Sequence, residues 1–185
     1  MAPGTPRIEA VRARAAGVRW LAFDIDGTLT DAHIYIGPNG EAMKAFNVRD
    51  GTGLTLLREA GLGLAIITAR RSAIVGLRAA ELRIDEVMQG VEDKAAALRS
   101  LADRKGVGLQ EVGFVGDDWA DLPAMTIAGF AASVSDGDEQ VRARAHWVSV
   151  APAGRGAVRE LADFLLRARG QYEALLARRL NGAAR

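Results

Sequence analysis

Two aspartates stand one residue apart at the end of an apolar run, in the stretch LAFDIDGTLTD at residues 21–31. Asp24 and Asp26 carry like charges, so bringing them together requires a compensating partner such as a metal ion. Oxygen-rich sites of this kind suit Mg²⁺. The glycine that follows, Gly27, lets backbone N–H groups approach a phosphate closely. The stretch therefore indicates metal-assisted phosphorus chemistry, with a solvated strand end as the plain alternative.

Three further polar features follow expected strands along the chain. They are Thr68, Lys94 and the acidic stretch GDDWAD at 116–121, which contains Asp117. In parallel α/β sheets, ligands bind beyond the carboxyl ends of the strands. Each feature alone has a plain explanation, such as a helix cap or a solvated face. Their occurrence after successive strands favours a single site.

The residue types fit phosphoryl transfer. Carboxylates from Asp24, Asp26 and Asp117 form a hard oxygen site for Mg²⁺. One carboxylate of the Asp24–Asp26 pair can attack phosphorus to form an aspartyl phosphate. The other can protonate the leaving oxygen and later activate water. Lys94 and Thr68 would bind phosphoryl oxygens where negative charge gathers.

The elements that must position these residues follow a simple alternation. Short apolar strands separated by amphipathic helices predict an α/β fold, a Rossmann-like three-layer parallel sheet covered on both faces. Strands are expected at 18–24, 62–68, 86–90, 112–116, 129–134 and 146–150. Helices are expected at 51–60, 71–83, 92–105, 118–127, 138–145, 156–168 and 171–180.

The segment between Asp31 and Asp50 interrupts the alternation. The turn GPNG separates the two plausible strands HIYI and EAMKAFNV, which predicts a short β-hairpin flap over about 32–48. A lone two-stranded hairpin is marginal in water. The hairpin is therefore expected to lean on another surface, such as a second subunit. The apolar side chains that need cover are Ile34, Ile36, Met43 and Phe46.

Length and composition limit the remaining possibilities. The 185 residues suit one domain, predicted over 18–180, with an N-terminal extension at 1–17 and a tail at 181–185. A net charge of +1 gives no reason to expect nucleic acid or an acidic membrane surface as a partner. The absence of cysteine excludes thiolate catalysis and cysteine-held zinc. Without a membrane span or signal peptide in the sequence, a cytoplasmic location is expected.

The four motifs resemble those of the haloacid dehalogenase-like phosphatase superfamily. The resemblance rests on DIDGT at 24–28, the threonine of IITAR, Lys94 and GDDWAD. It implies that Asp24 is the nucleophile and Asp26 the acid and base. It also implies that Mg²⁺ is held by the Asp24 carboxylate, the Asp26 backbone carbonyl and Asp117, with support from Asp118 and Asp121. A response-regulator receiver is excluded by the order of the motifs.

A closer resemblance extends over about residues 18–175. The sequence is similar to the 3-deoxy-D-manno-octulosonate 8-phosphate phosphatase family of lipopolysaccharide biosynthesis, capless members in which the hairpin replaces a cap domain. FNVRDG, together with the hairpin before it, is the most specific piece. The resemblance implies a homotetramer whose hairpins meet at the centre. The substrate contacts that it implies are Asn47, Val48, Arg49, Asp50, Gly51, Arg70, Arg78 and Lys94.

Some positions depart from the family pattern, and two other functions remain open. Thr28 and Ala69 replace a usual valine and glycine, while Thr55 stands where some relatives have an arginine. The absence of that arginine affects recognition of the sugar acid rather than the type of reaction. The alternatives are a nonulosonic-acid (sialic-acid-type) 9-phosphate phosphatase and a non-catalytic binding relative.

Overall fold

Six parallel strands form the centre of the computed structural model, which describes residues 6–182. Their spatial order is β5-β4-β1-β6-β7-β8, so β1 lies in the interior of the sheet between β4 and β6. The predicted parallel sheet is confirmed. The strand bounds are β1 Trp20–Phe23, β4 Gly63–Thr68, β5 Glu86–Gln89, β6 Val112–Val115, β7 Phe130–Ser133 and β8 Trp147–Val148.

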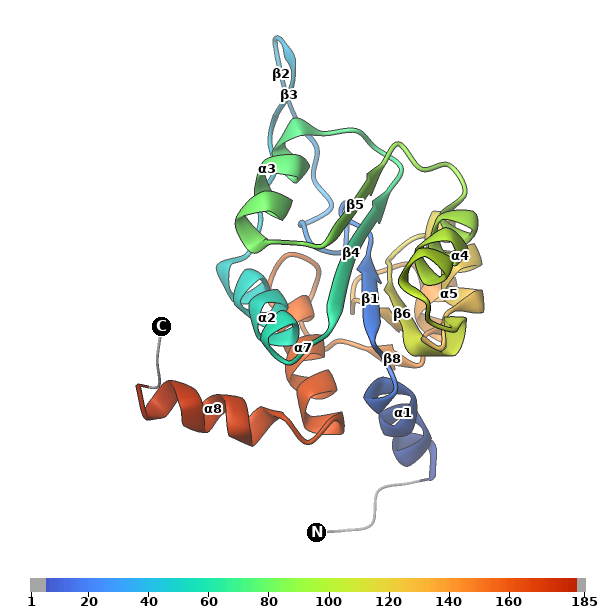
Figure 1. Cartoon of the computed structure of the whole chain (residues 1–185). Coiled ribbons are helices and arrows are strands. Elements are labelled where there is room, and N and C mark those ends of the chain that lie inside the picture. The colour runs from blue at the N-terminus through green and yellow to red at the C-terminus, as the bar shows by residue number, and fades with distance from the viewer. Residues whose placement is uncertain (1–5, 183–185) are drawn as a thin grey trace.

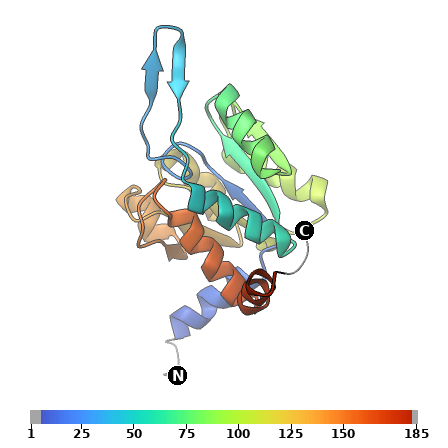
Figure 2. The ribbon, with the colours of Figure 1, turned by 90° about the vertical axis from the view of Figure 1, so that its left-hand side faces the viewer.

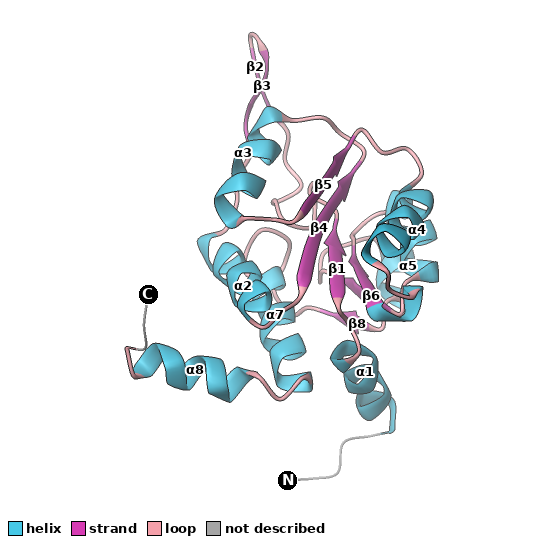
Figure 3. Ribbon diagram, in the orientation of Figure 1, coloured by secondary structure: helices cyan, strands magenta, loops and turns pink. Residues whose placement is uncertain are grey.

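Helices cover both faces of this sheet, as Figures 1 and 3 show. One face is packed by α1 Pro6–Ala16, α2 Val48–Glu59, α3 Ala73–Leu82, α7 Ala157–Ala168 and α8 Tyr172–Leu180. The other face is packed by α4 Lys94–Lys105, α5 Leu122–Ile127 and α6 Glu139–Arg144. Short 3₁₀ turns lie at Leu109–Glu111 and Trp119–Asp121. The predicted three-layer α/β class is therefore confirmed.

The apolar runs of the strands follow from burial on both faces. In β1, Leu21 and Phe23 point into one core cluster while Ala22 points into the other. This alternation is the two-residue period of a β-strand, and two covered faces leave no position for a polar side chain. Burying one large apolar side chain stabilises a fold by about 1.5–3 kcal/mol. The first polar position after β1 is Asp24, where the strand ends.

The predicted hairpin is present and extends away from the body of the molecule (Figure 2). It consists of antiparallel strands β2 Tyr35–Gly37 and β3 Gly40–Met43, joined through the GPNG turn. Ile36 and Met43 on these strands are 77% and 57% exposed. Phe46 differs from the expectation, because it packs against the core of the sheet at the base of the hairpin.

The predicted N-terminal extension contributes to the core in its described part. Residues 6–16 form α1, and Ala15 is fully buried against the same cluster as α7. The boundary expected at residue 18 therefore falls inside a packed region. Among residues 6–182, no helix combines the length and the apolar character that a bilayer crossing requires.

Helices α2 and α7 pack closely, and a buried carboxylate joins them. Asp50, which is 2% exposed in the first turn of α2, accepts hydrogen bonds from the backbone N–H groups of Gly156 (3.2 Å) and Arg159 (2.8 Å) at the start of α7. Burial raises the pKa of Asp50, and these hydrogen bonds oppose the rise. Asp50 therefore caps α7 from a neighbouring helix.

We expect Asp50→Ala to lower the free energy of unfolding by about 1–3 kcal/mol, because backbone N–H groups of α7 lose a buried charged acceptor. Urea unfolding followed by circular dichroism measures the change. The matched control is Asp103→Ala, since Asp103 is exposed on α4, and surface changes of this kind shift stability by about 0.5 kcal/mol or less. Equal stability of the two variants would contradict the capping role.

Candidate active site

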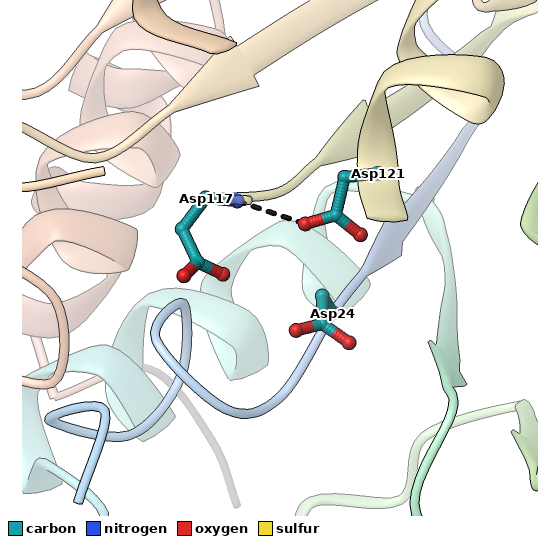
Figure 4. A group of neighbouring side chains, drawn as sticks. All are labelled: Asp24, Asp117 and Asp121. Atoms are coloured by element: carbon teal, nitrogen blue, oxygen red, sulfur yellow. Dashed lines mark hydrogen bonds between the residues drawn. The ribbon is translucent and has the colours of Figure 1, made fainter. Parts of the chain in front are cut away.

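Three aspartates from two loops meet at the carboxyl edge of the sheet (Figure 4). Asp24 follows β1, while Asp117 and Asp121 follow β6, the strand beside it. Each offers a carboxylate oxygen, and these oxygens lie within 4.8 Å of one another. Asp24 and Asp121 are 6% and 1% exposed. The sequence predicted Asp24 and Asp117 as metal ligands with Asp121 as a support, and in the structure a carboxylate oxygen of Asp121 lies in the same cluster.

Lys94 supplies a positive charge to this cluster. Its ammonium donates to Asp24 Oδ1 at 2.7 Å and to Asp121 Oδ1 at 2.5 Å, and the residue is 4% exposed. Asp93 caps α4 immediately before it, so the helix start fixes where Lys94 lies. Burial lowers the pKa of Lys94, but Asp24 and Asp121 raise it more, which keeps the lysine charged.

The second oxygen of Asp121 shapes the loop that carries Asp117. Asp121 Oδ2 accepts hydrogen bonds from the backbone N–H groups of Asp117 (2.9 Å) and Asp118 (3.2 Å). Asp118 itself is exposed and accepts a bond from the N–H of Trp119. Asp121 therefore contacts both Lys94 and the loop backbone, whereas Asp118 stays at the rim.

The loop after β1 brings backbone unusually close to Asp117. Gly27 has φ +90°, and a Cβ at this position would lie 2.0 Å from Asp117 Oδ2. Only glycine tolerates both the backbone conformation and the approach. The next residue, Thr28, is fully buried and donates its hydroxyl hydrogen to Asp117 Oδ1 at 3.1 Å. This departure from the family pattern thus gives Asp117 a hydrogen-bond donor.

Asp26 lies beside the cluster and has different partners. Its Oδ1 is hydrogen bonded to the ammonium of Lys44, which follows β3 of the hairpin. Its Oδ2 lies 3.6 Å from Nε of Arg70, in the loop after β4. The carboxylate of Asp26 is therefore separate from the three clustered aspartates. Thr68 ends β4 at the same edge and is 3% exposed.

The residues expected to contact substrate fall into two groups. Arg70 forms the first group, since its Nε lies near the Asp26 carboxylate. The second group, Asn47 to Gly51, forms the N-cap and first turn of α2. This helix begins three residues earlier than predicted. Arg78 lies against this turn, since a Cβ at Gly51 would be 2.4 Å from Arg78 Nη2. Its guanidinium also lies 5.7 Å from the ring centroid of Phe46 and pairs with Glu81.

Members of the first turn of α2 have different exposure. Val48 is 80% exposed and Arg49 is also exposed, so both are open to a ligand or a neighbouring chain. The Asp50 carboxylate is engaged by α7, and Asn47 accepts from the N–H of Arg49 while its amide donates to the carbonyl of Gly154. The structure does not bring this turn into the aspartate cluster.

The donor set fits a hard divalent cation. Burial and the charges of Asp24 and Asp121 raise the pKa of Asp117 to about 8. Burial and Asp121 likewise raise the pKa of Asp24 to about 6, against the opposing effect of Lys94. Within the described part of the chain, the cluster holds more negative charge than Lys94 balances. Carboxylate oxygens in excess of positive charge are the ligands that Mg²⁺ prefers.

Comparison with known proteins places this fold and site. Residues 78–161 match the haloacid dehalogenase-like hydrolase family. The 3-deoxy-D-manno-octulosonate 8-phosphate phosphatase of Escherichia coli (strain B / BL21-DE3) is 40% identical over 163 residues, covering 88% of this chain and 87% of that protein. The phosphatase of the same name from Yersinia pestis is 39% identical over 91% of this chain and 90% of its own length.

A solved structure agrees closely in fold. The 3-deoxy-D-manno-octulosonate 8-phosphate phosphatase from Moraxella catarrhalis, in complex with magnesium ion, phosphate ion and KDO molecule, superposes with a TM-score of 0.90 at 40% identity. The match covers 92% of this chain and 98% of that one. The chain described here belongs to the 3-deoxy-D-manno-octulosonate 8-phosphate phosphatase family of haloacid dehalogenase-like hydrolases, and it is a phosphoric monoester hydrolase. The predicted family and enzyme class are confirmed.

Sequence reasoning missed Lys44 at this site. The chain holds only three lysines, Lys44, Lys94 and Lys105, among its 24 basic residues. Two of the three have side chains that are 1% and 4% exposed and are bonded to aspartates of the site. In a chain that uses arginine nearly everywhere else, an isolated lysine beside the FNVRDG segment was the available signal.

Neutralising Asp117 is expected to stabilise the metal-free protein. An aspartate whose pKa is higher in the folded than in the unfolded protein makes the fold less stable as pH rises between those two pKa values, here from about 4 to about 8. We therefore expect Asp117→Asn to raise the unfolding temperature in EDTA at neutral pH by roughly 2–8 °C, which corresponds to about 1–2 kcal/mol. Differential scanning fluorimetry measures the shift, and the gain should shrink as pH falls.

The same experiment tests cation binding. Mg²⁺ should raise the unfolding temperature of the parent protein and leave Asp117→Asn nearly unchanged, because a ligand stabilises only the state that binds it. The matched control is Asp103→Asn, at an exposed aspartate of α4 outside the proposed metal site, which should respond to Mg²⁺ as the parent does. An equal Mg²⁺ response in all three proteins would rule out Asp117 as a cation ligand.

Proposed function

We propose that this enzyme hydrolyses 3-deoxy-D-manno-octulosonate 8-phosphate to 3-deoxy-D-manno-octulosonate and phosphate, in a Mg²⁺-dependent reaction through an aspartyl phosphate. The observation that carries the reaction type is the contact of Lys94 with both Asp24 and Asp121 beside Asp117. The substrate follows from the names of the relatives at about 40% identity. This family membership also argues against a non-catalytic binding role.

In the first step, a carboxylate oxygen of Asp24 attacks phosphorus. The bond between phosphorus and the sugar oxygen breaks, and Asp26 donates its proton to that leaving oxygen. Lys94 and the hydroxyl of Thr68 would hydrogen-bond the phosphoryl oxygens as negative charge spreads over them. Burial of Asp24 supports this role, since little water competes for the carboxylate.

In the second step, water attacks the phosphorus of the aspartyl phosphate. Asp26, now a carboxylate, takes a proton from that water, and the Asp24–phosphorus bond breaks to release inorganic phosphate. Asp24 returns as a free carboxylate and Asp26 is again protonated. The position of Asp26 outside the aspartate cluster supports an acid–base role that is distinct from the role of Asp24.

The residues proposed to hold Mg²⁺ are Asp24, Asp117 and the backbone carbonyl of Asp26, with Asp121 and Asp118 as supports. When bound, Mg²⁺ would offset the carboxylate charge and draw negative charge from the phosphoryl group. The magnesium ion in the Moraxella catarrhalis structure supports this choice of cofactor.

Substrate recognition is proposed to use arginines around the site. A sugar acid phosphate carries both phosphate and carboxylate oxygens, which match the planar guanidinium fork. Arg70 is 45% exposed in its side chain and lies beside Asp26, so it is the best placed of the expected contacts. Arg78, Arg49 and the start of α2 remain proposed contacts. At Thr55, the hydroxyl donates to the backbone carbonyl of Gly51 and stays within its own helix.

Kinetics decide between the proposed substrate and its alternative. We expect kcat/KM for 3-deoxy-D-manno-octulosonate 8-phosphate to exceed that for a nonulosonic-acid 9-phosphate by at least about tenfold, a difference of about 1.4 kcal/mol in transition-state binding. Phosphate release in Mg²⁺ measures both. A preference for the nine-carbon substrate would replace the proposed one.

Asp24→Asn should remove turnover of either substrate while its circular dichroism stays unchanged, and retained activity would exclude Asp24 as nucleophile.

We also propose a homotetramer in which the hairpins meet. The exposed apolar side chains of the hairpin support this arrangement, because a lone two-stranded hairpin is marginal and such side chains favour burial. The hairpin also stands clear of the body of its own chain (Figure 2). The exposed apolar residues in and beside the hairpin are Ile34, Ile36, Met43 and Val48.

Light scattering coupled to gel filtration should give a mass near four chains. Replacing Ile36, which is 77% exposed, by Asp should give smaller species, since a charge would be buried at the shared interface. The matched control is Ile8→Asp on α1, at the end of the molecule opposite the hairpin (Figure 1). A monomeric parent with full activity would contradict the tetramer. The cytoplasmic location stays a prediction from the sequence, and the lipopolysaccharide pathway stays a prediction from the family resemblance.

A further inference from the structure

Lys44 is a charged side chain in an unusual place. It follows β3 at the base of a hairpin that is otherwise well exposed, yet its side chain is only 1% exposed. Burying an ammonium is unfavourable unless oppositely charged groups surround it. Lys44 has two such partners, Asp26 on one side and Glu41 on the other, the latter at 3.0 Å.

Glu41, the partner of Lys44 within the hairpin, is fixed to the body of the protein. Glu41 accepts a hydrogen bond from the hydroxyl of Ser72, and that hydroxyl also caps the N-terminus of α3 by accepting from the N–H of Val75. The backbone N–H of Ser72 in turn donates to Gln89 Oε1 at 2.6 Å, at the end of β5. Glu41 therefore holds Lys44 against a rigid part of the fold.

Asp26 has Lys44 as its buried, oppositely charged partner. It lies in the loop after β1, outside any regular element, and its carboxylate is 21% exposed. Within residues 6–182, the other charged group that faces the carboxylate is Arg70, whose side chain is 45% exposed and lies 3.6 Å away. Lys44 is thus the buried partner of Oδ1, whereas Oδ2 faces the more exposed Arg70.

We propose that Lys44 is a positioning residue for the acid–base step, and that it holds the Asp26 carboxylate from the base of the hairpin. This inference rests on the proposed phosphatase function. Because its side chain is buried, Lys44 has no surface to offer a substrate, and it acts through Asp26 instead. The hairpin therefore serves the chemistry of its own subunit in addition to any contact between subunits.

A positioning role for Lys44 predicts different effects on substrates with different leaving groups. An alkoxide leaving from a sugar phosphate needs a proton from Asp26, whereas p-nitrophenolate leaves without one. If Lys44 positions the proton donor, its loss affects the first substrate much more than the second. The comparison uses kcat/KM, which ends at departure of the leaving group and is insensitive to the later hydrolysis of the aspartyl phosphate.

We expect Lys44→Met to lower kcat/KM on 3-deoxy-D-manno-octulosonate 8-phosphate by about 10²-fold, the lower end of general acid–base effects. For p-nitrophenyl phosphate, kcat/KM should fall by less than about fivefold. KM for the sugar phosphate should change little. The matched control is Lys105→Met, since Lys105 pairs with Glu86 away from the aspartates and should leave both reactions unchanged. Equal losses on both substrates, a loss confined to KM, or no loss would overturn the proposal.

A measurement without turnover tests the ion pair itself. A double-mutant cycle combines Lys44→Met and Asp26→Asn, with stability read from urea unfolding. If the two groups hold each other, the double variant is destabilised less than the sum of the single variants. Additive effects would show that Lys44 does not hold Asp26, whichever substrate the enzyme hydrolyses.

The outcomes also separate this inference from the proposed function. If the parent ignores the sugar-acid phosphate but cleaves another alkyl phosphate, the proposed substrate fails and the leaving-group comparison is made with that ester. If the parent cleaves no monoester, the proposed function fails, whereas the cycle still accepts or rejects the pairing of Lys44 with Asp26.

Discussion

Repulsion among buried carboxylates is the constraint on which the rest of this structure depends. Asp24, Asp117 and Asp121 are held within 4.8 Å at the edge of the sheet, although each would be more stable in water or farther apart. Lys94 offsets part of this charge from the start of α4. The remainder creates the demand for a divalent cation, so the feature that destabilises the empty fold is the one that would bind the cofactor.

The surrounding fold keeps these groups from moving apart. Both strands that carry them lie inside the sheet, packed by helices on two faces, and hydrogen bonds to Asp121 hold the second loop. Gly27 permits a backbone approach that any side chain would block. The energy that holds the carboxylates together therefore comes from the apolar core and the backbone. A second arrangement positions Asp26, which pairs with Lys44 of the hairpin.

Much of this could be anticipated from residue order. Apolar runs separated by amphipathic helices predicted the six strands, because strands covered on both faces need continuous apolar residues. The ends differed where local hydrogen bonds decide. Helix α2 begins at Val48 because the Asn47 side chain caps it, and α1 joins the core through Ala15, which composition alone marked as an extension. Polar residues after strands β1, β4 and β6, together with Lys94 at the start of α4, predicted one site, since the carboxyl ends of parallel strands share an edge.

The sequence by itself determined the fold class, the family and the residues available for chemistry, because these depend on patterns a few residues long. Only the tertiary structure decided how those residues are used. Asp50 caps α7 across 106 or more positions, Asp121 joins the carboxylate cluster, and Lys44 reaches Asp26 from the hairpin. Residue type alone does not tell which contacts each of these acidic residues makes, whereas burial and distance do. Those two properties arise only when distant segments pack together.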